Sequence, residues 1–196
     1  AQKLGIETLD PKGDYGPPLA IGAGEVRLME MAQAFSVFAT NGQKKKPVFI
    51  LNVQDRDSKT LSEWNESEIR EEEVLDPQVA FLINTVLSDQ SVNFGFRLNI
   101  PGHVAAVKTG TSNKEISPVK ILPSNLWTIG YTPSLVTGVW AGNSDGSPAK
   151  LSADGYTVAA PIWNKFMTEA LKEKPDEPIL EVIFEAPKGL SMQKSF

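Results

Sequence analysis

The sequence predicts an α+β domain in which an antiparallel sheet is flanked by helices. Two β-rich runs, residues 126–131 and 135–141, are joined by Thr132-Pro133-Ser134, which is typical of an antiparallel hairpin. Amphipathic helical patterns precede and follow these runs instead of alternating with single strands, which argues against a parallel βαβ sheet. The composition, 41% hydrophobic and 22% charged, is that of an ordinary globular chain.

The N-terminal part predicts loops followed by one amphipathic helix. A short helical signal ends at Asp10-Pro11, and a loop rich in Gly and Pro follows over residues 13–24. Residues 26–40 carry apolar side chains at helical spacing, and Asn41-Gly42 supplies a left-handed stop. We expect five side chains of this helix to pack in the core: Leu28, Met31, Ala32, Phe35 and Phe38.

The middle of the chain predicts a hairpin and an acidic connector. Residues 48–53 are apolar and β-branched, and residues 61–64 supply the second arm of the hairpin. Five glutamates follow between residues 66 and 73. No second cluster of ligands accompanies them, so we interpret this stretch as a solvated connector rather than a metal site.

The second half predicts a helix, three strands and a closing helix. Asp76-Pro77 begins the first helix, because Asp is a good N-cap and Pro is tolerated in the first turn. Residues 104–109 predict a short strand that leads into Gly110, and residues 112–125 predict a loop that overhangs a cleft. The closing helix is expected at residues 160–172. We assign residues 1–175 to one domain and residues 176–196 to a tail or the start of a following segment.

Composition and charge exclude several classes of function. The formal net charge of −5 does not attract phosphate backbones, so we expect no nucleic-acid partner. The chain has no cysteine and a single histidine, His103, so we expect no metal site and no cysteine nucleophile. No apolar run approaches the ~20 residues of a membrane-spanning helix. The chain opens at Ala1 without an initiator Met, which we interpret as the start of a fragment.

Lys108, Thr109, Gly110 and Thr111 are the candidate binding residues. A glycine near the end of a strand lets another backbone lie close, because no Cβ intervenes. The Lys108 ammonium attracts a carboxylate, and the two threonine hydroxyls can hydrogen-bond it. A free backbone N–H at an exposed strand edge receives an extended peptide or stabilises an oxyanion. A surface strand that ends in a turn is the plain alternative.

The chain around this strand resembles penicillin-binding protein transpeptidase domains. The segments that carry the resemblance occur in family order and are residues 21–35, 38–42, 99–102, 107–111, 127–133, 136–143, 145–148 and 161–167. The pieces Gly-Val-Trp-Ala-Gly-Asn and Asp-Gly-Ser-Pro look most like the bifunctional members, in which a glycosyltransferase domain precedes the transpeptidase domain. The resemblance implies a partial penicillin-recognising, β-lactamase-like fold, with residues 107–111 as the third-motif strand.

The nucleophile of this family is expected outside the chain. The family combines Ser-x-x-Lys, Ser-x-Asn and Lys-Thr-Gly, with the serine acylated. Ser-x-x-Lys occurs three times here, at Ser117–Lys120, Ser147–Lys150 and Ser191–Lys194, but always after Lys108 and in loops or the tail. Ser91-Val92-Asn93 lies only fifteen residues before Lys108. We interpret all four as chance matches, so we expect no catalytic residue in this chain.

The resemblance implies a serine-type DD-transpeptidase that crosslinks stem peptides ending in D-Ala-D-Ala. Penicillins mimic these peptides, and no cofactor or metal is implied. We expect the parent protein to work outside the bacterial cytoplasmic membrane, anchored by an N-terminal helix, and the fragment alone to be inactive. Three alternatives are a DD-carboxypeptidase, a β-lactamase-like hydrolase and a module that only binds β-lactams or peptides.

Five further residues are expected to be structural. His103 is interpreted as a structural or surface histidine, on an opposite face to Lys108. The four tryptophans, Trp64, Trp127, Trp140 and Trp163, are expected in the core or half-buried. Trp127 begins the strand expected beside Lys108, so it is the tryptophan nearest to the candidate site.

Overall fold

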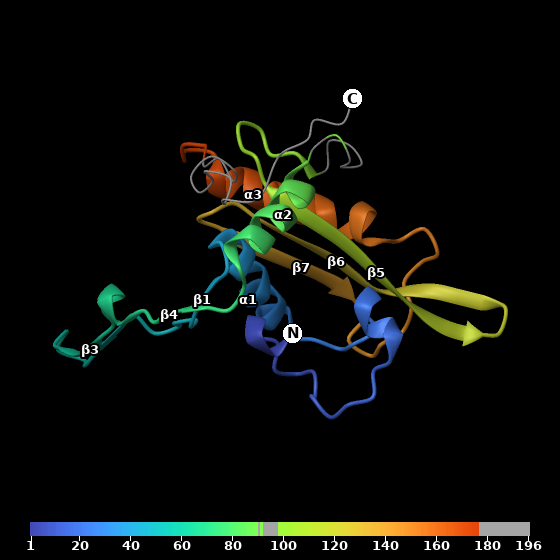
Figure 1. The fold of residues 1–196 in the computed structure, drawn as a ribbon, viewed down its shortest axis with the longest axis horizontal. Helices are drawn as coiled ribbons and strands as arrows, with labels where there is room; N and C mark the ends of the chain where they lie inside the picture. The colour runs from blue at the N-terminus through green and yellow to red at the C-terminus, as the bar shows by residue number, and fades with distance from the viewer. Residues whose placement is uncertain (90, 92–97, 177–196) are drawn as a thin grey trace.

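The structure, a computed structural model, describes residues 1–89, 91 and 98–176. Figure 1 shows helices packed around an antiparallel sheet, with an arm that contains the β2–β3 hairpin and extends from the body. The helices are α1 (Leu28–Ala39), α2 (Pro77–Ser88) and α3 (Ala160–Leu171). The strands are β1 (Gln43–Lys45), β2 (Asn52–Gln54), β3 (Thr60–Glu63), β4 (Glu71–Glu73), β5 (Ala106–Ser117), β6 (Lys120–Tyr131) and β7 (Val136–Gly142). The predicted α+β class is confirmed.

The main sheet has the strand order β5-β6-β7, so β5 lies at an edge. The register pairs Lys108 with Ile129 and Gly110 with Trp127. The hairpin between β6 and β7 turns at Thr132, whose N–H donates to the Leu135 carbonyl at 2.9 Å. The predicted hairpin of residues 126–131 and 135–141 is therefore confirmed.

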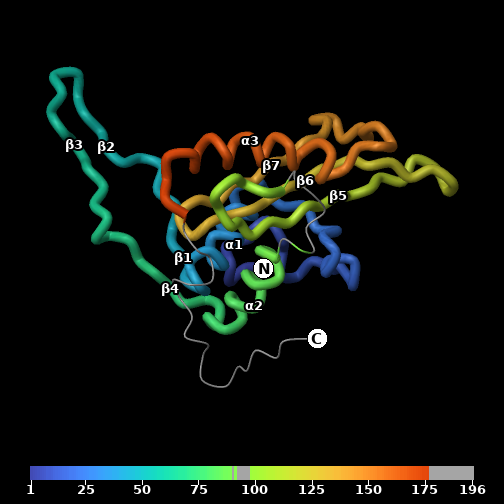
Figure 2. Tube along the Cα trace, turned by 90° about the horizontal axis from the view of Figure 1, so that it is seen from above, coloured from blue at the N-terminus to red at the C-terminus, as the bar shows by residue number. Residues whose placement is uncertain are grey.

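The sheet is the middle of three layers, with α3 on one face and α1 and α2 on the other (Figure 2). Ala106 belongs to a cluster with Tyr131 and the phenylalanines of α1. The next residue, Val107, belongs to a cluster with Trp163 and Met167 of α3. Successive residues of β5 therefore face opposite layers, as the alternation of a β-strand requires.

Helix α1 begins and ends close to its predicted bounds. Asn41 and Gly42 both have positive φ, 54° and 92°, which produces the expected left-handed stop. A Cβ on Gly42 would lie 2.0 Å from the Leu75 carbonyl oxygen, so no other residue fits there. The core stripe is confirmed in part: Phe35 and Phe38 pack on the sheet cluster, whereas Leu28 is 39% exposed.

The hairpin predicted at residues 48–53 and 61–64 is present but shorter. Its ladder runs only from Asn52 to Gln54 and from Thr60 to Glu63, and every residue of these strands is exposed. None of the described residues forms a layer over residues 48–51. Their apolar side chains would therefore stay exposed to solvent even if the strand included them, so pairing there would bury no hydrophobic surface. Figures 1 and 2 show this hairpin at the end of an arm that leaves the body.

The acidic stretch is a strand partner as well as a connector. Glu71–Glu73 forms β4 and pairs with β1. Lys44 and Lys45 of β1 lie 3.2 and 2.7 Å from the carboxylates of Glu72 and Glu71. Lysines on β1 therefore oppose glutamates on β4 across this two-stranded ladder.

The expectation of a loop at residues 112–125 is wrong. The ladder of β5 and β6 continues from Ser112 and Asn125 to Ser117 and Lys120, with irregularities after Ser112 and after Glu115. The sequence did not indicate a strand here because residues 113–115 are polar and exposed, so they show no hydrophobic alternation. The short helical signal before Asp10 proves to be a single 3₁₀ turn, Gln2–Leu4, which ends at Gly5 with φ 98°.

Candidate functional site

The four predicted binding residues lie together in the first half of edge strand β5. Lys108 is exposed, and its Nζ donates a hydrogen bond of 2.7 Å to the Thr109 carbonyl on the same strand. No described strand pairs with the outer edge of β5. An edge strand presents unpaired N–H and C=O groups, so this segment offers a template for an extended chain.

The alternation of β5 separates the four side chains into two pairs. Lys108 and Gly110 share the face of Ala106, towards α1 and α2. Thr109 and Thr111 share the face of Val107, towards α3. An extended ligand beside β5 would therefore meet the lysine from one side of the strand and the threonines from the other.

Gly110 has free space where a side chain would point, whereas Gly155 packs closely against the other side of its backbone. A Cβ on Gly110 would meet only the Cβ of Trp127, at an ordinary contact distance of 3.7 Å. Its backbone is in close contact with Gly155, where a Cβ would lie 2.5 Å from the Gly110 carbonyl oxygen. The backbone that lies close to Gly110 is therefore that of Gly155 in this chain, and the approach of a ligand backbone to Gly110 stays a prediction.

Thr111 already has one partner. Its Oγ1 accepts a hydrogen bond of 3.0 Å from the N–H of Gly155, at the start of the single π-helical turn Gly155–Ala159 that leads into α3. Nothing in the local sequence of β5 indicates this contact, because the two residues are 44 positions apart. The one available signal is Asp154 with Thr157, the spacing of a helix capping box.

The structure keeps the other candidate motifs away from any described helix start. Ser117 and Lys120 lie at the tip of the β5–β6 hairpin. Ser147 and Lys150 lie in the loop after β7. Ser91 occupies a turn, and Ser191–Lys194 and Val92-Asn93 lie outside the described residues. Of the serines that the structure describes, Ser91, Ser117 and Ser147, none begins a helix, which is where the family's nucleophile is expected.

His103 is structural. Its ring is buried, and its Nε2–H donates a hydrogen bond of 3.0 Å to the Leu171 carbonyl at the end of α3. It lies before β5, joined to Ile100 by an isolated bridge, so the strand parity expected for it does not apply. The imidazole therefore anchors the C-terminus of α3 and takes no part in the Lys108 edge.

The tryptophans lie in the core or half-buried as expected, except Trp140, which is exposed. Trp163 is fully buried and Trp127 is half-buried, while Trp140 is 38% exposed. Trp127 and Trp140 are directly opposed across β6 and β7. Because Gly110 pairs with Trp127 on the other side, one row across the sheet joins the candidate site to two aromatic side chains.

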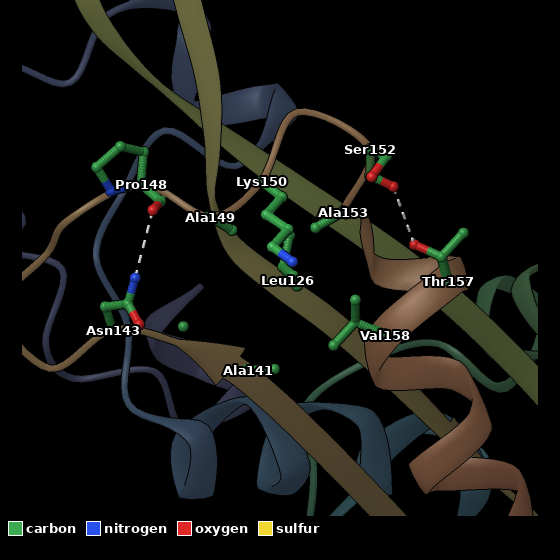
Figure 3. A pocket seen from close by; sticks show the side chains of 11 residues that line it. Leu126, Ala141, Asn143, Pro148, Ala149, Lys150, Ser152, Ala153, Thr157 and Val158 are labelled. Carbon is green, nitrogen blue, oxygen red and sulfur yellow. Dashed lines mark hydrogen bonds between the residues drawn. The ribbon is translucent and has the colours of Figure 1, made fainter.

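A pocket of about 610 Å³ lies behind the sheet from Lys108. Figure 3 shows Lys150 among apolar side chains of this pocket, with Leu126 on its floor and Thr157 and Val158 on the helical side. Lys114 Nζ donates to the Gly146 carbonyl at 2.7 Å. This hydrogen bond connects the distal part of the β5–β6 hairpin to the loop that borders the pocket. None of the four predicted binding residues lines it.

The described residues contain no metal site and no membrane span. Within residues 1–89, 91 and 98–176, no three His, Asp or Glu side chains gather where they could hold an ion. In the same part of the chain, no helix combines the length and the hydropathy needed to cross a bilayer.

The comparisons with known proteins agree with this fold. A family profile described as penicillin binding protein transpeptidase domain matches residues 17–168. Penicillin-binding protein 2D of Bacillus subtilis is 29% identical over 179 residues, which cover 89% of this chain and 24% of that protein. Penicillin-binding protein 1A of Aquifex aeolicus is 30% identical, over 90% of this chain and 22% of its own length. The chain thus spans about a quarter of the length of these relatives.

Solved structures show the same architecture. The penicillin-binding protein PonA1 from Mycobacterium tuberculosis superimposes with a TM-score of 0.79 at 22% identity, over 90% of this chain and 49% of that chain. The PonA1 complex with penicillin V gives a TM-score of 0.76 at 24% identity, over 90% of this chain and 50% of that one. At these identities the likeness establishes the fold.

Proposed function

This chain belongs to the family of penicillin-binding protein transpeptidase domains, and we propose that its β5 edge binds the acyl donor in peptidoglycan crosslinking. The donor is a stem peptide that ends in D-Ala-D-Ala, and β-lactams occupy the same edge. The observation that carries the proposal is the position of Lys108–Thr111, on the outer edge of a sheet and open to an extended ligand.

The binding step follows from the chemistry of this edge. The donor lies antiparallel or parallel to β5 and exchanges backbone hydrogen bonds with it, as in β-strand addition. The threonine hydroxyls donate to the terminal carboxylate, and the Lys108 ammonium supplies positive charge beside it. Gly110 admits the donor backbone, because its own face is open.

The covalent step uses a serine from polypeptide outside this chain. Its hydroxyl oxygen attacks the carbonyl carbon of the penultimate D-Ala, the peptide bond breaks, and the terminal D-Ala leaves with the proton. An acceptor amine then attacks the ester, forms the crosslink and returns the proton to the serine. A backbone N–H at the edge of β5 stabilises the oxyanion in both steps. The missing part of the same domain is therefore the first partner of this chain.

We propose that the parent protein acts on the outer side of the bacterial cytoplasmic membrane, where its substrate is exposed. The names of the relatives support this placement, since they are penicillin-binding proteins. A preceding glycosyltransferase domain and an N-terminal membrane anchor belong to the same proposal.

A fluorescent penicillin tests the assignment. The 196-residue chain should remain unlabelled, whereas the longer protein with its upstream serine should give a covalent band. Lys108→Ala in the longer protein should slow acylation by about 10²-fold, the scale of one pre-organised electrostatic group. Lys114→Ala is the matched control, because this lysine lies on the same strand but contacts the Gly146 carbonyl. A labelled fragment, or equal rates for the two variants, would overturn the assignment.

The nature of the acceptor is tested separately. Incubation of the longer protein with stem peptides should yield crosslinked dimers. Products that are only shortened by one D-Ala would instead indicate a carboxypeptidase. A protein that binds penicillin reversibly and makes neither product would be a binding module.

A further inference from the structure

The back of the Lys108–Thr111 strand is held by one residue, Gly155. Its N–H donates to Thr111 Oγ1 at 3.0 Å, and its carbonyl accepts from Thr128 Oγ1, also at 3.0 Å. Thr111 lies on β5 and Thr128 on β6. Both backbone polar groups of Gly155 are therefore engaged by threonine hydroxyls, one from the edge strand β5 and one from β6 beside it.

The position admits only glycine. A Cβ on Gly155 would lie 2.4 Å from the Trp127 carbonyl oxygen, 2.5 Å from the Gly110 carbonyl oxygen and 3.0 Å from the Gly110 nitrogen. These are backbone atoms of the sheet, which cannot rotate away as a side chain would. The turn thus packs directly against Gly110 with nothing between the two backbones.

The turn that presents Gly155 is fixed on its other side. Asp154 accepts a hydrogen bond of 2.6 Å from the Thr157 N–H, and Thr157 Oγ1 accepts from the Asp154 N–H at 3.0 Å. The Gly155 carbonyl also accepts from the Ala160 N–H, which links this π-helical turn to the first residue of α3. The strand is therefore braced against a helix whose other residues fill the core.

The direction of the Thr111 hydrogen bond decides what its hydroxyl does next. The oxygen accepts from Gly155, so the hydroxyl hydrogen is not used in this bond. A hydroxyl can accept and donate at once. The contact fixes the position of Oγ1 and leaves its O–H to point away from the turn.

We propose that Gly155 and Thr128 are positioning residues for carboxylate recognition by Thr111. Gly155 holds the Thr111 oxygen so that its O–H donates to the carboxylate of the donor or of a β-lactam. Thr128 holds the Gly155 peptide in the orientation that makes this possible, although it is fully buried and touches no ligand. The inference rests on the proposed function, since it assigns the ligand group that Thr111 meets.

The test compares acylation by penicillin G and by its methyl ester in the longer protein, because the ester lacks the carboxylate charge. Thr128→Val should lower the acid-to-ester ratio of acylation rates by about fivefold to tenfold, the scale of one hydrogen bond. Thr128→Ser should restore the ratio. Thr137→Val is the matched control, because this threonine also faces α3 but bonds Met167 Sδ at 3.0 Å. Thermal melting of each variant confirms that the fold persists.

Thr111→Val separates the inference from the function on which it rests. If Thr111→Val and Thr128→Val both lower the ratio and Thr137→Val does not, the positioning role stands. If Thr111→Val lowers it and Thr128→Val leaves it unchanged, the positioning role is wrong and the proposed function survives. If Thr111→Val leaves the ratio unchanged, the carboxylate role of Thr111 and the inference both fail. A wild-type protein that neither compound labels would overturn the proposed function itself.

Discussion

The β5–β6–β7 sheet and the β2–β3 hairpin have the same local structure but opposite surroundings. The sheet is covered on both faces, by Trp163 and Met167 from one side and by the phenylalanines of α1 from the other. The hairpin is bare, with Phe49 beside it 75% exposed and Leu61 within it 62% exposed. Antiparallel pairing alone therefore says little about stability, which is supplied by the layers that cover the strands.

Removal of a buried aromatic should have the largest effect. Trp163 is fully buried in the α3 layer, so Trp163→Ala should lower the free energy of unfolding by about 3–5 kcal/mol. Phe166→Ala on the same helix removes a side chain that is 53% exposed and should cost far less. Urea unfolding of the two variants measures the difference. Equal decreases in the free energy of unfolding would show that the buried face of α3 does not stabilise the sheet.

A buried hydrogen bond on the other face should come next. The Tyr131 hydroxyl donates to Asn84 Oδ1 at 2.6 Å, and Asn84 Nδ2 donates to the Phe38 carbonyl at 3.0 Å. Tyr131→Phe leaves the Asn84 oxygen without its donor and should cost about 1–3 kcal/mol. Tyr15→Phe serves as a control, because the Tyr15 hydroxyl bonds the exposed Asp10 N–H. A loss no larger than the control would place this contact outside the core.

Ionisation of the same tyrosine should lower the stability of the fold at alkaline pH. Burial raises the pKa of Tyr131 above its ordinary value of 10.0. The folded state therefore favours the neutral phenol, and this contribution is complete below pH 10 and is lost as the pH rises above it. Unfolding midpoints between pH 9 and 12 should fall more steeply for the wild type than for Tyr131→Phe. Parallel curves would contradict the prediction.

Ion pairs at the base of the arm should contribute little. Lys45 and Glu71 are about half exposed, so Lys45→Ala should lower the free energy of unfolding by less than ~1 kcal/mol. The difference from wild type should shrink further in 1 M salt, because exposed charges are screened. A loss above that limit, or one unaffected by salt, would contradict the prediction. It would show that β1 and β4 contribute to stability as much as strands that are covered by helices.

Substitutions in the hairpin itself should have the smallest effect. Leu61→Ser removes an exposed side chain and should change the free energy of unfolding by less than ~0.5 kcal/mol. Its readout is the same urea titration, with Ile129→Ser as the contrasting variant, since Ile129 is buried in β6. A large loss at Leu61 would show that the arm is covered in solution.

The sequence predicted the elements that bury a face more accurately than those that do not. Helices α1, α2 and α3 were found because apolar spacing and caps such as Asp76 mark them. The distal part of β5 and β6 was taken for a loop, because Asn113, Lys114 and Glu115 are all polar and exposed, so they create no hydrophobic period.

The candidate site could be proposed from the sequence where a single segment contains it. Lys108–Thr111 form a continuous motif, so their place at a strand edge followed from local pattern and family resemblance. Gly155 and Thr128 were missed, because their relation to Thr111 is a contact between distant segments. Ordinary residue types in an ordinary turn give no chemical signal until the chain is folded.

The order of the strands has a consequence for biosynthesis. The three strands follow one another without interruption from residue 106 to residue 142, while the turn at Gly155 and helix α3 are made later. A ribosome needs about 1.5–6 s for the 29 residues from 142 to 171, whereas a hairpin closes within about 10 μs. The strands can therefore pair before α3 has been synthesised. The apolar face that α3 covers stays exposed until then. That interval is when the nascent chain would most need a chaperone.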